Sequence, residues 1–287
     1  MRSDPAVSRR TVLGGALSGA LTMAGCGGSD QPTRQPVAAQ GKTSQDLPPP
    51  GSPPPPPSVT AERVRSAARG TDVGLVIVRP EGVPAANLPV CLALHGRGGN
   101  ARMFHDLGLP RMLTEAVRAG VPPFAVAGLD GGDGYWVGRD RRDDPQRMLS
   151  EEVPRWLAER GLRPEPFAAM GISMGAFGAL NYARSHRTAA VAAISPALFA
   201  SWPEARTRNV FGTQARWEAV EPLRHTGELD PSRLGIFCGT KDPFIPGARA
   251  LAERTRPKVA SMTAGAHDVG YWRRVLPEVL RFLGGYR

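Results

Sequence analysis

Gly171-Ile172-Ser173-Met174-Gly175 is the stretch of this sequence that decides the fold. An apolar run at residues 166–170 precedes it and a run rich in Gly and Ala at residues 175–185 follows it, so the pattern predicts a strand, a sharp turn and a helix. A serine at such a turn is held in a strained backbone conformation, and glycines two residues away let the strand and the helix approach closely. The same residues are also compatible with a glycine-rich turn whose serine caps the following helix.

The composition is that of a soluble globular protein, with 41% hydrophobic and 22% charged residues in a chain of 287. The formal net charge is +10, but the basic residues are spread along the chain, without a Lys/Arg block or an aromatic-basic repeat. This distribution argues against nucleic acid as a partner. It favours either affinity for anionic envelope surfaces or a basic solvated surface that has no partner.

The first 26 residues have the features of an export signal. Arg9 and Arg10 precede an apolar stretch at residues 12–24, which resembles a twin-arginine signal and is too short and too rich in glycine to favour a membrane span. The stretch ends in Leu21-Thr22-Met23-Ala24-Gly25-Cys26, which is similar to a bacterial lipobox with Cys26 as the lipidated residue. A plain cleaved signal with an incidental cysteine is the alternative.

Residues 27–59 follow as a segment rich in Pro, Gly, Ser and Gln, including a proline run at residues 53–57. Such a segment cannot bury apolar area, and we expect it to be an extended, disordered tether. Residues 60–287 are then a single domain. The expected location is the extracytoplasmic face of the bacterial cell membrane, with a lipid anchor on Cys26, or secretion if the lipobox is not used.

The rest of the chain alternates between predicted strands and helices. Apolar runs bounded by Gly and Pro predict strands at residues 73–79, 89–94, 124–129, 189–194, 234–238 and 258–263. Helical spacing of apolar residues predicts helices at residues 103–119 and 146–160. This alternation predicts an α/β fold with a mostly parallel sheet and helices on both faces.

Three residues with complementary chemistry each follow a predicted strand, in the order Ser173, Asp242, His267. A serine hydroxyl needs a base, and a neutral imidazole needs an acid that fixes its tautomer. Because the carboxyl ends of parallel strands meet at one edge of a sheet, we expect these three side chains to lie together. Asp268 is a poor alternative acid, because adjacent side chains diverge.

The loops at this edge supply further candidates. His95-Gly96-Arg97-Gly98-Gly99 follows a strand and suits a loop that points a backbone N–H at a reacting carbonyl oxygen, with His95 in a structural role. Tyr135 and Trp136 are expected to line the substrate cleft, with a packed loop as the alternative. Trp202 belongs to a less regular stretch at residues 195–233 that either forms part of an acyl pocket or packs its aromatic side chains inward.

Metal and disulfide sites are not predicted. Asp130, Asp133, Asp140, Asp143 and Asp144 form an acidic group, but their spacing does not match an EF-hand loop. Cys91 and Cys238 fall in predicted strands that are not neighbours, so we expect two buried free thiols.

From about residue 75 to its end, the chain resembles the esterase D and antigen 85 type of α/β-hydrolase, a family of serine esterases and acyltransferases. The matching stretches are Leu94-His95-Gly96-Arg97-Gly98-Gly99, Asp130-Gly131-Gly132 with Tyr135-Trp136, Glu151-Glu152-Val153-Pro154, the pentapeptide around Ser173, Cys238-Gly239-Thr240-Lys241-Asp242, and His267 followed by Tyr271-Trp272. The resemblance implies an α/β-hydrolase fold in which Ser173 is the nucleophile, His267 the base and Asp242 the acid. It also implies that the backbone N–H groups of Met174 and Arg97 bind the oxyanion, and that no metal or organic cofactor is needed.

These features together predict a serine hydrolase that cleaves a small-molecule, lipid or sugar ester through an acyl-enzyme on Ser173. Two alternatives remain. The first is a mycolyltransferase-like acyltransferase, which passes the acyl group to a sugar or lipid alcohol instead of water. The second is a non-catalytic binding protein, built on a hydrolase fold and tethered to the cell surface.

Overall fold

The computed structural model describes residues 58–186 and 188–287. The predicted export signal, Cys26 and almost all of the predicted tether lie outside these residues. Within them, no helix combines the length and the apolar character that crossing a membrane requires.

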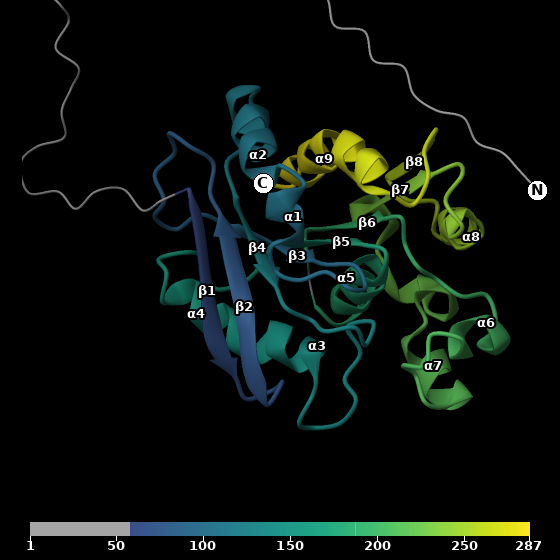
Figure 1. The fold of residues 1–287 in the computed structure, drawn as a ribbon. Helices are drawn as coiled ribbons and strands as arrows, with labels where there is room; N and C mark the ends of the chain where they lie inside the picture. The colour runs from purple at the N-terminus through teal and green to yellow at the C-terminus, as the bar shows by residue number, and fades with distance from the viewer. Residues whose placement is uncertain (1–57, 187) are drawn as a thin grey trace, which may run out of the picture. The chain divides into compact units, whose positions relative to one another are not determined.

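One eight-stranded sheet forms the centre of the described residues (Figure 1), with the strand order β1-β2-β4-β3-β5-β6-β7-β8. The strands are β1 (Val59–Ser66), β2 (Thr71–Val78), β3 (Val90–Leu94), β4 (Ala125–Leu129), β5 (Ala168–Ile172), β6 (Ala190–Ile194), β7 (Leu234–Gly239) and β8 (Val259–Thr263). Strand β2 pairs antiparallel with both β1 and β4, and all other pairs are parallel. The prediction of a mostly parallel sheet is confirmed.

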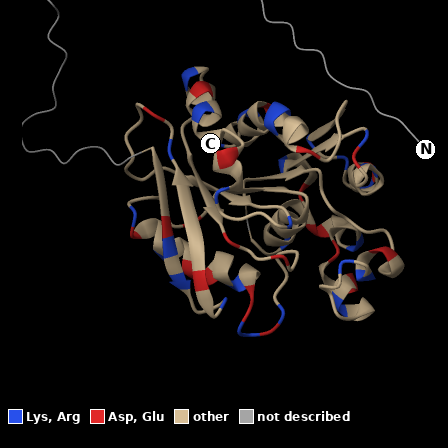
Figure 2. Cartoon of the chain, in the orientation of Figure 1, with Lys and Arg blue, Asp and Glu red and all other residues tan. Residues whose placement is uncertain are grey.

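The five central strands, β3 to β7, are buried along their whole length. Their sequences are accordingly apolar throughout, because a strand covered on both faces has no solvent side to alternate with. Half of the positions of the edge strand β1 are exposed, and acidic and basic residues follow one another along this strand (Figure 2). There Arg65 and Asp72 form an exposed ion pair at 3.4 Å.

Helices cover both faces of the sheet (Figure 1), as predicted. Phe104, Leu113 and Leu276 of α1, α2 and α9 pack into the core on one face, and Trp156, Phe177 and Leu251 of α4, α5 and α8 into the core on the other. The helices are α1 (Met103–Asp106), α2 (Leu109–Arg118), α3 (Pro145–Arg147), the π-helix η1 (Met148–Glu152), α4 (Val153–Ala158), α5 (Met174–Ser185), α6 (Trp202–Arg206), α7 (Gln214–Val220), the 3₁₀ helices η2 (Pro222–Arg224), η3 (Thr226–Glu228) and η4 (Pro231–Arg233), α8 (Ile245–Thr255) and α9 (Val269–Gly284).

Two predicted helices are each divided. The helix expected at residues 103–119 breaks between α1 and α2, because Gly108 has a left-handed φ of 91° and Pro110 occupies the first turn of α2. The helix expected at residues 146–160 consists of α3, η1 and α4 in succession, and Pro154, which has no N–H, lies in the first turn of α4. The strand β1 was not predicted at all.

Candidate active site

Ser173 lies at the turn between β5 and α5, with φ 57° and ψ −115°. A Cβ added to Gly171 would collide with the carbonyl of Gly175, and one added to Gly175 would collide with the carbonyl of Leu94. The two glycines therefore permit the close approach that was expected of them. Ser173 occupies the N-cap position of α5 but makes no side-chain cap hydrogen bond, so its hydroxyl is not used to cap the helix.

Ser173, His267 and Asp242 form a continuous chain of hydrogen bonds. His267 Nε2 lies 3.0 Å from Ser173 Oγ, and His267 Nδ1 lies 2.8 Å from Asp242 Oδ2. The side chain of Asp242 is fully buried, whereas that of His267 is partly exposed. The carboxylate thus faces the imidazole from inside the protein, and the hydroxyl faces it from the other side.

Hydrogen bonds determine the charge state of Asp242. Burial by itself would raise the pKa of this carboxyl, but hydrogen bonds from His267, the Phe244 N–H and Ser195 outweigh it and lower the pKa below its usual value. The Phe244 N–H donates to Asp242 Oδ1 at 2.8 Å, which leaves Oδ2 for the imidazole. The carboxyl is therefore ionised at neutral pH, as an acid that stabilises an imidazolium must be.

Two aromatic rings hold the imidazole in place. The ring centroids of Phe244 and Trp272 each lie 5.2 Å from that of His267, both in edge-to-face geometry. Trp272 Nε1 in turn donates to Ser195 Oγ at 3.1 Å. No role was predicted for Ser195 or Phe244 from the sequence. The signal for Ser195 was available, because it directly follows the neighbouring strand β6.

The loop after β3 packs against the serine. The Cβ position of Gly96 would lie 3.6 Å from Ser173 Cβ, and the Gly98 N–H donates to Asp133 Oδ1 at 2.7 Å, which ties the loop to the segment after β4. Within residues 58–186 and 188–287, neither the Met174 N–H nor the Arg97 N–H donates to a protein acceptor. Both donors predicted for the oxyanion therefore remain available on the two segments next to Ser173.

His95 holds this loop from inside. Its Nε2 accepts from the Gly131 N–H at 2.9 Å, and its Nδ1 lies 2.7 Å from the Gly96 carbonyl oxygen, so the ring is neutral with its proton on Nδ1. Burial lowers the pKa of His95, which agrees with that neutral form. These contacts fit the structural role expected for this histidine.

Tyr135 and Trp136 are placed differently from the expectation that they line a cleft. Trp136 has no exposed surface, and Tyr135 is 2% exposed. A Cβ on either Gly131 or Gly178 would overlap the Trp136 indole, and Trp136 Nε1 donates to the His95 carbonyl oxygen at 3.1 Å. Both side chains thus belong to the core. The indole of Trp136 fits there because Gly131 and Gly178, on two separate segments, leave room for it.

Trp202 lies at the start of α6 and is partly exposed. Its ring centroid is 6.2 Å from that of the buried Trp217 in α7. The aromatic side chains of residues 195–233 therefore pack mainly inward, with Trp202 at the border with solvent.

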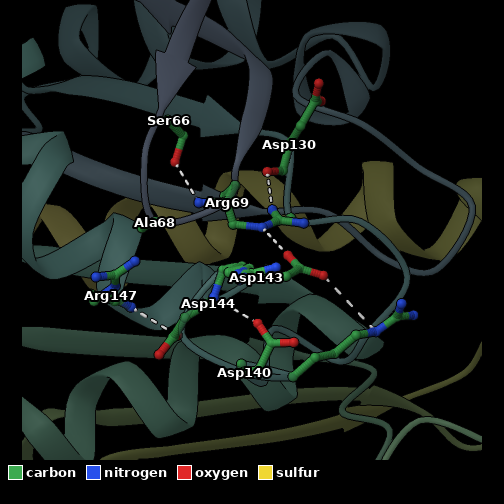
Figure 3. Close-up of polar contacts among 12 residues, drawn as sticks. Ser66, Ala68, Arg69, Asp130, Asp140, Asp143, Asp144 and Arg147 are labelled. Atoms are coloured by element: carbon green, nitrogen blue, oxygen red, sulfur yellow. Dashed lines mark hydrogen bonds and ion pairs between the residues drawn. The ribbon is translucent and has the colours of Figure 1, made fainter.

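The acidic group after β4 binds protein donors (Figure 3). The carboxylate of Asp130 accepts from the Gly74 N–H at 2.8 Å and from the Ala101 N–H at 2.7 Å. Arg69 Nε donates to Asp143 at 2.7 Å, and its Nη1 donates to the Asp130 carbonyl oxygen at 2.9 Å. Among the described residues, no cluster of three or more His, Cys, Asp or Glu side chains has the arrangement of a metal site. These carboxylates instead join three loops at one edge of the sheet.

Cys91 and Cys238 are both buried and free, which confirms that prediction. They lie in β3 and β7, which are separated by β5 and β6. Burial raises the pKa of the Cys238 thiol to about 12 and also raises that of Cys91, so neither is a nucleophile at neutral pH.

Comparison with known proteins identifies a family and similar folds. The sequence model of the family described as "Putative esterase" matches residues 66–283. A solved structure of a ferulic acid esterase superposes with a TM-score of 0.66 at 19% identity, covering 80% of this chain and 98% of the other. The S-formylglutathione hydrolase of Agrobacterium tumefaciens gives 0.64 at 16% identity, with coverage of 79% and 94%. The MPT51 protein of Mycobacterium tuberculosis gives 0.64 at 19% identity, with coverage of 79% and 98%. No curated protein matches the chain.

Proposed function

Because this chain belongs to that family of esterases and has the α/β-hydrolase fold, we propose that it hydrolyses carboxylic esters through an acyl-enzyme on Ser173. The observation that carries the proposal is the unbroken hydrogen-bond chain from Asp242 through His267 to Ser173, which ends on a hydroxyl held at a strained turn. No feature of the described residues gives that hydroxyl a structural partner in α5.

In the first half of the reaction, Ser173 Oγ attacks the ester carbonyl carbon while His267 Nε2 takes the hydroxyl proton. The carbonyl oxygen becomes an oxyanion, which we assign to the Met174 and Arg97 N–H groups. His267 then gives the proton to the alkoxide as the carbon–oxygen bond breaks, so the alcohol leaves neutral and the acyl group stays on Ser173. Throughout, Asp242 holds the imidazole with its proton on Nδ1.

In the second half, His267 takes a proton from water and the resulting hydroxide attacks the acyl carbon. The bond to Ser173 Oγ breaks, the proton returns to the serine, and the carboxylic acid is released. An alcohol in place of water would give transfer instead of hydrolysis. Turnover of p-nitrophenyl esters with and without glycerol or trehalose, with analysis of the products, distinguishes the two outcomes.

A fluorophosphonate probe tests the nucleophile, because its phosphorus traps an activated serine hydroxyl. We expect stoichiometric labelling of Ser173, and Ser173→Ala is expected to abolish labelling and ester turnover together. The thermal transition of that variant is expected to stay nearly unchanged, since the hydroxyl does not cap α5 and its removal relieves strain at the turn. Labelling of a different serine would move the active site, and a folded wild-type protein that is neither labelled nor active would contradict the proposal.

We further propose that residues 1–26 direct export and that Cys26 carries a lipid which holds the enzyme on the extracytoplasmic side of the membrane. The support is the sequence of that segment alone. Cys26→Ala is expected to release the enzyme from the membrane fraction. Unchanged membrane retention of this variant, with the signal still cleaved, would contradict the lipid anchor.

A further inference from the structure

A cavity of about 230 Å³ lies beside the proposed active site, between the segment after β6 and helix α8. Phe199, in the segment after β6, and Phe244, at the N-cap of α8, both line it. Since Phe244 also contacts the ring of His267, a single side chain separates this cavity from the proposed base. The cavity is therefore close enough to the proposed base to be considered as a place for one end of a substrate.

Arg208 lines the same cavity, and two aromatic rings lie against its guanidinium. Its guanidinium carbon lies 5.3 Å from the ring centroids of both Phe199 and Phe244. Its Nε is buried and has no hydrogen-bond partner, and no ion pair joins it to an acidic side chain in the part of the chain that the structure describes. The Arg208 side chain as a whole is partly exposed, so the accessible N–H groups of its guanidinium can donate to a bound anion.

The other charged side chains of the cavity each form a hydrogen bond with the backbone. Glu204 accepts from the Ala200 N–H at 3.0 Å, and Arg254 donates to the Leu223 carbonyl oxygen at 2.8 Å. Two arginines and one glutamate leave the lining with a positive balance. Burial raises the pKa of Tyr135, and the charges of Arg208 and Arg97 oppose that rise, so both arginines act on the same phenol.

We propose that Arg208 binds a carboxylate carried by the ester substrate, so that the enzyme prefers esters with an anionic end over neutral esters of equal length. The inference rests on the proposed function of Ser173. A guanidinium held between two phenyl rings keeps its edge free for charge-assisted hydrogen bonds to a carboxylate. Leu198, Pro243 and Pro246 in the same lining supply apolar contacts for the carbon chain that carries it.

The test compares two pairs of esters in a pH-stat assay with the purified enzyme. Monoethyl adipate and ethyl hexanoate differ by a carboxylate at the end of the acid half, and the acetate ester of 6-hydroxyhexanoate and hexyl acetate differ by one at the end of the alcohol half. We expect the wild-type enzyme to have a higher kcat/KM for the anionic ester in at least one pair. Arg208→Leu is expected to lower that preference by roughly tenfold to a hundredfold, mainly through KM, because the contact is remote from the bond that breaks.

Three further variants separate this role from a general effect of charge. Arg206→Leu removes an exposed arginine from the same segment and is expected to leave the preference unchanged. Arg208→Lys keeps the charge without the planar fork and is expected to give an intermediate preference. Glu204→Gln removes the only carboxylate of the lining and is expected to increase the preference, and it tests the inference even if Arg208→Leu does not fold.

Equal kcat/KM values within both pairs for the wild-type enzyme would overturn the inference, as would a loss of preference in Arg206→Leu equal to that in Arg208→Leu. Fluorophosphonate labelling separates this failure from a failure of the proposed function. A labelled enzyme that hydrolyses both members of each pair equally overturns the carboxylate site alone. An enzyme that is neither labelled nor active overturns the proposed function.

Discussion

The turn around Ser173 and the segment at residues 195–233 lie at the same edge of the sheet but are held in different ways. Backbone atoms crowd around the turn, so that Gly171 and Gly175 have no room for a side chain. The segment after β6 depends on the buried carboxylate of Glu221, which accepts from Trp217 Nε1 at 3.0 Å, the Phe199 N–H at 3.2 Å and the Leu223 N–H at 3.3 Å. Close backbone packing thus holds the turn. The segment at residues 195–233 is instead held by the Glu221 carboxylate, which accepts hydrogen bonds from three of its residues.

The largest expected effect is on turnover, and it concerns Asp242, whose hydrogen bonds lead through His267 to Ser173 at the turn. Asp242→Asn is expected to lower kcat by about 10⁴-fold, because an amide can donate to the imidazole and favour the wrong tautomer. Asp268→Asn is the matched control. The Asp268 side chain accepts from the Tyr271 N–H at 2.8 Å and caps α9, a role that asparagine also fills, so a loss below about tenfold is expected. Similar kcat losses in both variants would mean that Asp242 is not the acid.

Gly175→Ala tests how little space the turn contains. The added Cβ would meet the Leu94 carbonyl oxygen, and backbone on both sides cannot move aside easily, so we expect a loss of about 3 kcal/mol in the free energy of unfolding by urea. Gly227→Ala is the matched change in residues 195–233. A Cβ there meets no atom within 4 Å, and the expected change is below about 1 kcal/mol in either direction. Equal losses would remove the contrast between the two regions.

We expect the free energy of unfolding to depend on pH through Glu221, which lies in residues 195–233. Burial raises the pKa of Glu221 from 4.5 to about 7, against the opposing effect of its hydrogen bonds. Below pH 4.5 the carboxyl is protonated in both the folded and the unfolded chain. As the pH rises toward 7, only the unfolded chain loses this proton, so stability decreases by an amount on the order of 3 kcal/mol and the full contribution is lost above pH 7.

Glu221→Gln is therefore expected to flatten the decrease in unfolding free energy between pH 5 and pH 8, even though the amide cannot satisfy all three donors and lowers stability at every pH. Glu218→Gln, which changes a more exposed carboxyl of α7, is expected to keep the wild-type slope. A slope that is the same in all three proteins would exclude Glu221 as its source.

The contrast between the turn around Ser173 and residues 195–233 explains how much of the fold and of the candidate site could be predicted from the sequence. The turn around Ser173 depends on residues that are close in the chain, so the pattern of glycines and flanking apolar runs was sufficient to predict it. The order Ser173, Asp242, His267 was also sufficient to predict that these three side chains lie together. Each follows a parallel strand, and the carboxyl ends of these strands must reach the same edge of the sheet. That Cys91 and Cys238 do not pair with each other followed from strand order in the same way.

Features that depend on contacts between distant segments were missed. The burial of Trp136 requires Gly131 and Gly178 together, and neither glycine identifies the other from the sequence. The exposed edge strand β1 has little of the apolar character by which strands were recognised. Likewise, nothing local to Arg208 indicates that two phenylalanines from separate segments enclose its guanidinium.

The smallest expected effect concerns the cap of α7. Thr213 Oγ1 accepts from the Arg216 N–H at 3.2 Å, so Thr213→Ala is expected to cost about 1 kcal/mol and Thr213→Ser much less. Because α7 has seven residues, the loss should be seen as faster hydrogen exchange of its own amides, with little change in α5. Ser173→Ala is the counterpart at the N-cap of α5, where no cap hydrogen bond exists and no loss of protection is expected. Faster exchange throughout α5 in Ser173→Ala, with none in α7 of Thr213→Ala, would reverse the comparison between the two regions.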